Sequence, residues 1–230
     1  MPEPLIGESI TDIDRSEAGE LEIDFTTSAW RTTTPGLNLW SSSIEVEWGA
    51  TKHLGLALDL SGAKGVGQNS AAVPFELGLR LGAAWALIHD FERDIHLQLE
   101  ASARVLKEET ENSLELGESS RRGAVDLRGG ARRGLWTLRG ALGIGLGGSG
   151  PRAVSLRSSV AIFHELKPWT RIGFAGLEVD ADGGRTDSVV LAPTVVFGWS
   201  RLRLGSALVG NVTGAGLSLG VMLRVIYEPG

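Results

Sequence analysis

Large apolar residues alternate with small or polar residues along most of this chain. In the stretch FELGLRLGAAWALIHD, Leu77, Leu79 and Leu81 occupy one parity, while Gly78 and Arg80 occupy the other. A period of two residues predicts a β-strand with one parity on each face of a sheet. The second face holds mostly glycine and alanine, which is not the mixed charged surface that a soluble sheet presents to water. The pattern therefore indicates a sheet whose two faces do not meet the apolar core and bulk water that a soluble sheet has on its two sides.

Twelve segments repeat this alternation, and none carries a 3.6-residue helical period. They are approximately 19–33, 36–49, 52–62, 72–89, 91–107, 122–134, 136–147, 152–166, 169–180, 187–199, 201–211 and 215–228. The links alternate in length: GAKGVGQNSA and EETENSLELGESSRR are long and polar, whereas GAT, HDF and RGLW are tight. Short turns at one end and longer loops at the other are typical of transmembrane β-barrels. The sequence thus predicts an all-β fold, a closed antiparallel up-and-down transmembrane β-barrel of about twelve strands.

Aromatic residues gather near the ends of the predicted strands. Most of the tryptophans lie at or near the short turns, and two more flank the first link at the loop end. Indole rings prefer the interface between bilayer and water, where the ring is apolar and the N–H stays hydrated. We therefore predict an aromatic girdle on the lipid-facing surface, made of Trp48, Trp85, Trp136, Trp169, Trp199, Tyr227, Trp30 and Trp40.

Composition removes several classes of protein. The formal net charge is −6 and the isoelectric point is about 5.3, so no nucleic-acid partner is expected. The chain has no cysteine, which excludes disulfides and thiolate metal sites. It has no apolar run approaching the roughly 18 residues of a membrane-spanning helix. The first residues, MPEPLIGESI, lack the basic and apolar parts of a secretion signal.

With these features the chain resembles the outer-membrane β-barrels of Gram-negative bacteria, in particular small porin-like channels. The resemblance extends from about Gly19 to Tyr227 and is one of pattern. It implies a mature chain in the bacterial outer membrane, with residues 1–18 as a periplasmic N-terminal extension and residues 19–230 as the barrel. Large apolar side chains would face lipid, and the other parity would line the interior. The implied partners are membrane lipids, small hydrophilic solutes or ions, and a periplasmic or outer-membrane protein.

The inward parity predicts an uneven distribution of charge. An acidic wall would consist of Glu22, Asp24, Glu45, Glu47, Asp59 and Glu76, and a basic wall of Arg80, Arg104, Arg128, Arg132, Arg139, Arg157, Arg171, Arg203 and Arg224. Closure of the last strand against the first would bring Arg224 towards Glu22 and Asp24. Two interpretations stay open: the walls face each other across a watery pore, or their side chains pair and fill the barrel.

No residue pattern predicts catalysis or a cofactor. The string GIGLGG ends a predicted strand without the helix that a phosphate-binding loop requires, and DADGG lacks the spaced ligands of a calcium loop. His96 faces the predicted interior beside Gln98 and Glu100, but no serine is arranged with a histidine as a nucleophile requires. We therefore expect no enzyme activity, no metal and no cofactor.

The expected function is passive diffusion of small hydrophilic solutes or ions through a charge-lined outer-membrane channel. One alternative is a structural or assembly barrel that anchors or sheathes a partner protein. A lipase-like barrel enzyme and a soluble β-sandwich are the remaining alternatives.

Two local irregularities are also predicted. The parity of the large residues changes between Phe174 and Leu177, which indicates a β-bulge near Gly176. Pro193 lies within a predicted strand and has no N–H, so it should interrupt one ladder of hydrogen bonds.

Overall fold

The chain forms twelve β-strands that account for nearly all of the described residues. The computed structural model describes residues 18–32, 38–66, 76–90, 93–107, 121–147, 154–166, 172–183, 188–199, 201–213 and 216–229. The strands are β1 (Leu21–Thr32), β2 (Asn38–Thr51), β3 (Leu54–Val66), β4 (Glu76–Asp90), β5 (Ile95–Lys107), β6 (Arg121–Arg133), β7 (Trp136–Gly147), β8 (Val154–Glu165), β9 (Ile172–Gly183), β10 (Ser188–Trp199), β11 (Leu202–Thr213) and β12 (Gly216–Tyr227). Within these ranges, no helix is long and apolar enough to cross a membrane.

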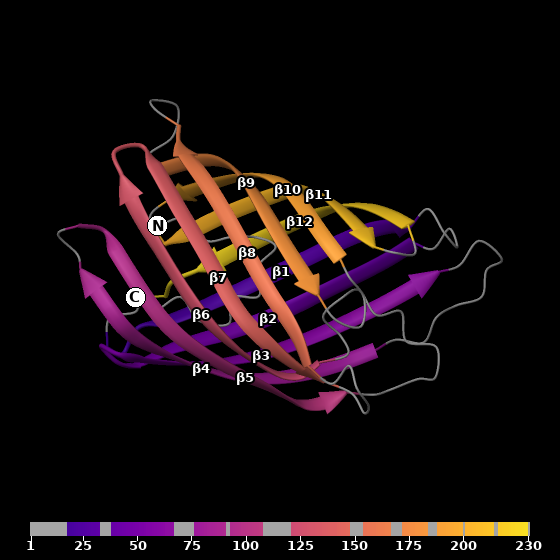
Figure 1. Ribbon diagram of the computed structural model, residues 1–230, viewed down its shortest axis with the longest axis horizontal. Coiled ribbons are helices and arrows are strands. Elements are labelled where there is room, and N and C mark those ends of the chain that lie inside the picture. Colours follow the sequence, from indigo (N-terminus) through magenta and orange to yellow (C-terminus); the bar gives the residue numbers. More distant parts are fainter. Residues whose placement is uncertain are drawn as a thin grey trace.

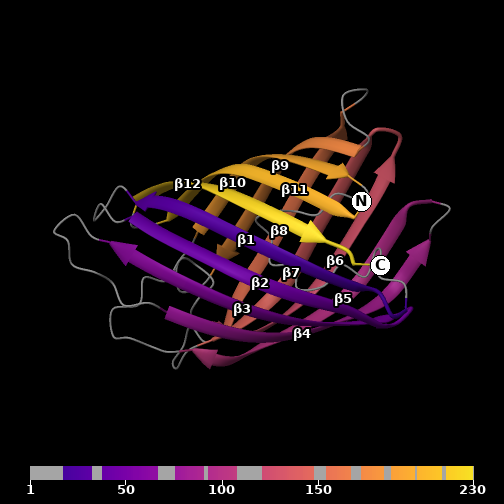
Figure 2. The ribbon, with the colours of Figure 1, turned by 180° about the vertical axis from the view of Figure 1, so that it is seen from behind.

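The strands close into one antiparallel barrel in which each strand pairs with its neighbours in sequence (Figures 1 and 2). Figure 2 shows the closing seam, where β12 lies beside β1. The seam is paired from Ile23 opposite Tyr227 to Thr32 opposite Ser218 without a register shift. Closure leaves no unpaired sheet edge, which is the condition for a sheet to cross hydrocarbon. The predicted fold class, a closed antiparallel barrel of twelve strands, is therefore confirmed.

The outer face of the barrel is apolar on every strand. A large apolar side chain is exposed on each one: Phe25, Ile44, Leu58, Leu81, Leu99, Leu127, Leu142, Leu156, Leu177, Leu191, Leu208 and Leu219. The opposite parity holds the buried residues, most of which are charged, polar or alanine. Each strand has 12 to 15 residues, more than the roughly 9–11 that a tilted strand needs to cross a bilayer. The face that a soluble protein would bury is the one that this barrel turns outward.

Tight hairpins join the strands at one end of the barrel. Between β6 and β7 the turn consists of Gly134 and Leu135, and Gly134 has a φ of 63°. Residues with a side chain rarely adopt this left-handed backbone conformation, which explains the glycine at that position. The backbone N–H of Ala86 donates to the carbonyl of His53, which ties the β2–β3 turn to β4.

The two predicted irregularities have different outcomes. The bulge near Gly176 is wrong, because β9 pairs with β8 and with β10 in an unbroken register. A side chain at Gly176 would overlap the ring of Phe163 on β8, so the glycine serves to accommodate that ring rather than to mark a bulge. At Pro193 the pairing with β11 is interrupted at Ala192 and Pro193, and it resumes at Thr194 in the same register.

Candidate functional site: the charged interior

The inner face of the barrel carries the predicted charged residues. The register places these on one face: Glu22, Asp24, Glu45, Glu47, Asp59, Arg80, Arg104, Arg128, Arg132, Arg139, Arg157, Arg203 and Arg224. The side chain of Glu76 and the whole of Arg171 lie outside the described residues. The interior of the barrel is therefore the candidate functional site.

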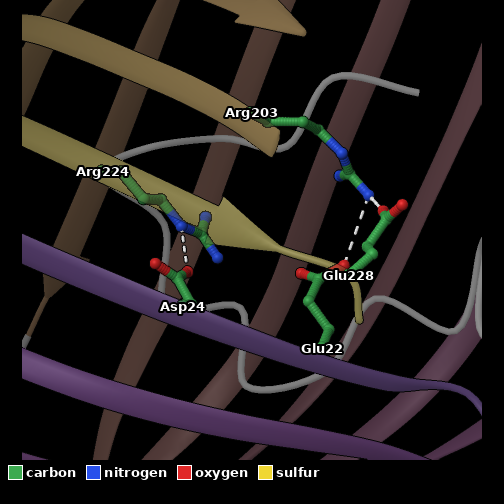
Figure 3. Close-up of polar contacts among 5 residues, drawn as sticks. All are labelled: Glu22, Asp24, Arg203, Arg224 and Glu228. Atoms are coloured by element: carbon green, nitrogen blue, oxygen red, sulfur yellow. Dashed lines mark hydrogen bonds and ion pairs between the residues drawn. The ribbon is translucent and has the colours of Figure 1, made fainter. Parts of the chain in front are cut away.

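A first group of ion pairs lies across the closing seam (Figure 3). Arg224 on β12 forms a hydrogen-bonded ion pair with Asp24 on β1. Arg203 on β11 reaches the carboxylate of Glu22 at 3.3 Å and also pairs with Glu228, just beyond β12. The sequence expectation that closure brings Arg224 to Asp24 is met. These pairs link β11, β12 and β1 from the inside, in addition to the ladder of backbone hydrogen bonds.

The seam group continues into the acidic side of the barrel. Glu45 on β2 interacts electrostatically with Arg224 on one side and with Arg80 on the other. Arg80 on β4 in turn lies 3.4 Å from the carboxylate of Asp59 on β3. Three carboxylates are thus flanked by two guanidinium groups, and the acidic wall is bounded by arginine at both ends.

A second group of ion pairs crosses β5 to β8. Arg128 lies 2.6 Å from Glu100 and 3.8 Å from Asp126, and Arg157 donates to Asp126 at 3.0 Å. Asp126 is on β6 and Arg157 is on β8, so this pair passes over β7. It passes at Gly143, where an added Cβ would overlap the Asp126 carboxylate. The glycine makes room for the ion pair.

Acidic residues also occur on the side of the barrel that the sequence predicted to be basic. Glu165 on β8 pairs with Arg132 at 2.6 Å near the short turns. Glu178 on β9 faces inward and is only 1% exposed, as is Glu100 on β5. Glu178 was not among the predicted lumen residues, although Leu177 and Val179 on either side of it carry the apolar parity of the outer face. The inward charges described on β1 to β3 are thus acidic, whereas acids and arginines are mixed on the side predicted to be basic, and many of these side chains form ion pairs along the wall.

Small inward residues lie under the side chains of neighbouring strands. A Cβ at Gly130 would overlap the ring of His96, and one at Gly78 would come within 2.8 Å of the Ser61 hydroxyl. These contacts explain the glycine-rich parity. Much of that parity is small because larger side chains from the next strand lie across it.

Several residues of the predicted aromatic girdle lie on the outer face, as a girdle requires, and one does not. Trp48, Trp85, Trp136, Trp40 and Tyr227 are exposed on the outer face. Trp136 contacts the ring of His164 edge-on at a centroid distance of 4.5 Å. Trp169 and the side chain of Trp199 lie outside the described residues.

Trp30 is a correction to the predicted girdle. It shares the inward parity of Glu22 and Asp24, and its indole N–H donates to Ser28 Oγ at 2.7 Å. It packs against a buried cluster of Ala192, Ala207 and Val209 inside the barrel. Its position next to a link suggested the girdle, but its parity within β1 decides its side.

Comparisons with known proteins identify shared fold only. No protein-family model matches the chain, and no curated protein sequence matches it. Among solved structures, the KdgM porin is similar with a TM-score of 0.62 and 11% identity, covering 90% of this chain and 98% of that one. A KdgM porin in complex with disordered oligogalacturonate is similar with a TM-score of 0.60 and 10% identity, covering 90% and 98%. The translocator domain of the autotransporter NalP from Neisseria meningitidis has a TM-score of 0.54 and 13% identity, covering 94% and 90%.

These proteins share a barrel of the outer-membrane type with this chain, at identities too low to carry function. Channels and autotransporter translocators both occur among them. The fold therefore supports an outer-membrane barrel, and the residues of the interior have to indicate what it does.

Proposed function

We propose that the barrel is a bacterial outer-membrane channel for the passive diffusion of small hydrophilic solutes or ions. The observation that carries the proposal is the combination of an apolar outer face on every strand with a charged, hydrogen-bonding inner face. Hydrocarbon requires the first face, and polar solutes are stabilised by the second. The fold shared with the KdgM porin supports the proposal.

The pairing of charges suggests the class of solute. The KdgM porin has been captured with oligogalacturonate, which is an acidic oligosaccharide. In this chain, by contrast, arginines and carboxylates neutralise one another along the wall, as in the pairs Arg80–Asp59 and Arg157–Asp126. A neutralised wall favours small ions of either sign and uncharged polar solutes over a long polyanion.

Conductance in a planar lipid bilayer tests the proposal. We expect discrete, steady current steps from the folded barrel, with a reversal potential in a salt gradient that reports ion preference. Asp59→Asn removes one inward carboxylate and leaves Arg80 without that partner, so the reversal potential should move towards anion preference. Asp94→Asn makes the same change in an exposed turn and should leave it unchanged. A folded barrel that carries no current overturns the proposal.

A second candidate is an assembly barrel that anchors or sheathes a partner protein of the outer membrane or periplasm. The observation in its favour is burial: the carboxylates of Glu100 and Glu178 are almost fully shielded, which an open watery pore would not require. An occupied interior would give this burial and no conductance. Absence of current, together with co-purification of a partner through residues 1–18, supports this alternative.

The proposed function is transport without catalysis. Hydrolysis assays on phospholipid and ester substrates, made with the folded barrel in detergent and in vesicles, test this part separately. Turnover that survives removal of contaminating lipases would contradict it.

A further inference from the structure

An uncharged patch lines the interior at the loop end of the barrel. It consists of the inward positions within 28–30, 39–43, 190–194, 207–211 and 218–222, none of which is charged. Trp30 is its largest member, and Val190 and Met222 pack with it against the buried residues beneath. Three of the ion pairs described above, Arg224–Asp24, Arg203–Glu22 and Arg132–Glu165, lie towards the short turns instead. The interior of the barrel thus changes from charged residues to apolar and hydroxyl-bearing residues at this patch, and this difference indicates a different kind of contact with a solute.

The indole of Trp30 lies flat against the wall. An added Cβ at Gly220 on β12 would come within 2.8 Å of Cδ2 and 2.9 Å of Cε3 of the ring. Only glycine at this position lets the ring lie across β12, next to Val209 on β11. Trp30 is on the inward parity and only partly buried, so part of this residue stays accessible. This is the geometry of an aromatic platform.

Uncharged hydrogen-bonding groups surround the platform. The hydroxyls of Ser28 and Ser41 share a hydrogen bond of 2.6 Å, and Ser28 also accepts the indole N–H. Asn211, the inward position next to Val209, is 7% exposed, and its Oδ1 accepts no hydrogen bond in the part of the chain that the structure describes. The position diagonal to it on β12 is Gly220, at a separation of about 7–8 Å for such neighbours. A buried acceptor without a donor is unfavourable unless a ligand supplies one.

We propose that this patch is a binding subsite for one ring of a neutral saccharide. The apolar face of a pyranose ring stacks on the exposed indole, and a ring hydroxyl donates to Asn211 Oδ1. Both contacts use groups that the fold holds in place. The patch itself carries no charge, and the inward Glu178 on β9 lies opposite its member Ala192, so an uncharged sugar is favoured over an acidic one. The inference rests on the proposed function, because the sugar must reach the interior, and it deepens that function by naming the solute class.

Calorimetric titration of the folded barrel with maltotriose tests the subsite directly. Trp30→Ala should weaken binding about tenfold or more, as expected for loss of an aromatic contact. Trp30→Phe should keep most of the affinity, because a flat ring remains, and Asn211→Leu should weaken binding while keeping the side-chain volume. Trp40→Ala is the matched control, since Trp40 lies at the same end of the barrel but on the outer face, 59% exposed. Trigalacturonate should bind more weakly than maltotriose.

The outcomes separate the subsite from the channel. A barrel that conducts ions but binds neither maltotriose nor lactose overturns the subsite and leaves the channel proposal intact. A barrel that binds maltotriose through Trp30 but carries no current supports the subsite and overturns the channel. Equal binding by wild type and Trp30→Ala, or tighter binding of trigalacturonate, overturns the subsite. If Trp30→Ala fails to fold in a gel-shift assay, Trp30→Phe and Asn211→Leu decide the question.

Discussion

Leu142 and Gly143 are neighbours on β7, and they face opposite environments. Leu142 is 57% exposed on the outer surface, where fluid hydrocarbon adapts to any apolar shape. Gly143 faces inward, where an added Cβ would lie 2.6 Å from the carbonyl of Val125 and would overlap the Asp126 carboxylate. The outer face therefore needs only to be apolar, whereas the inner face needs side chains of one particular size and charge. The first requirement is chemical, and the second is steric and electrostatic.

The inner face itself depends on its ion pairs. Arg224→Leu should cause the largest loss of stability, because Asp24, only 3% exposed, keeps a buried charge without this partner. Removing one member of a buried pair costs about 3–5 kcal/mol of folding free energy. Urea unfolding of the barrel in phospholipid vesicles measures the difference.

The double variant Asp24→Leu/Arg224→Leu serves as the control for that prediction. It removes both charges, and we expect it to recover most of the lost stability. If Arg224→Leu is as stable as the wild type, water reaches Asp24 and the interior is wetter than its burial indicates.

A charge on the outer face should have the next largest effect. Leu142→Arg places a guanidinium group near the middle of the apolar band and should cost about 2–4 kcal/mol. Leu142→Ile keeps the surface apolar and should be nearly neutral. The same vesicle unfolding assay compares the two. Equal stability of the Arg and Ile variants would mean that this face does not meet lipid.

A steric change on the inner face should have the smallest effect of the three. Gly143→Val inserts a side chain beneath the Asp126–Arg157 pair, and such overpacking costs about 1–3 kcal/mol. Gly140→Ala on the outer face is the control, since its Cβ would lie 3.4 Å from its nearest neighbour, the Ser159 carbonyl. Unfolding midpoints of both variants should separate, with Gly143→Val the less stable. Similar midpoints would show that the inner glycines are not needed for the fit.

The strands and their two faces could be predicted from the sequence because the alternation is local. Each segment carries the period of two by itself, and the placement of Leu58, Leu81 and Leu142 on the outside required no knowledge of other strands. The inward position of Trp30 could have been predicted by the same rule, since it follows Glu22 and Asp24 at even spacing along β1. The prediction failed there because proximity to a link was given more weight than parity.

The contacts between inward side chains could not be predicted in this way. Arg157 reaches Asp126 across β7 only because the register places Gly143 between them, and Gly176 is small because it faces Phe163. These side-chain contacts depend on the stagger between strands, which is fixed only when the whole sheet closes into a barrel.

The sequence alone determined that this chain is a barrel with an apolar exterior, and it determined which residues face inward for most positions, Trp30 and Glu178 being exceptions. The alternation of faces along a strand follows from covalent geometry, so it can be recognised in each segment by itself. The tertiary structure decided that inward acids and bases meet as pairs and that Trp30 lies over Gly220. These arrangements join residues as far apart in the chain as Asp24 and Arg224, and only closure of the sheet brings such residues within contact distance.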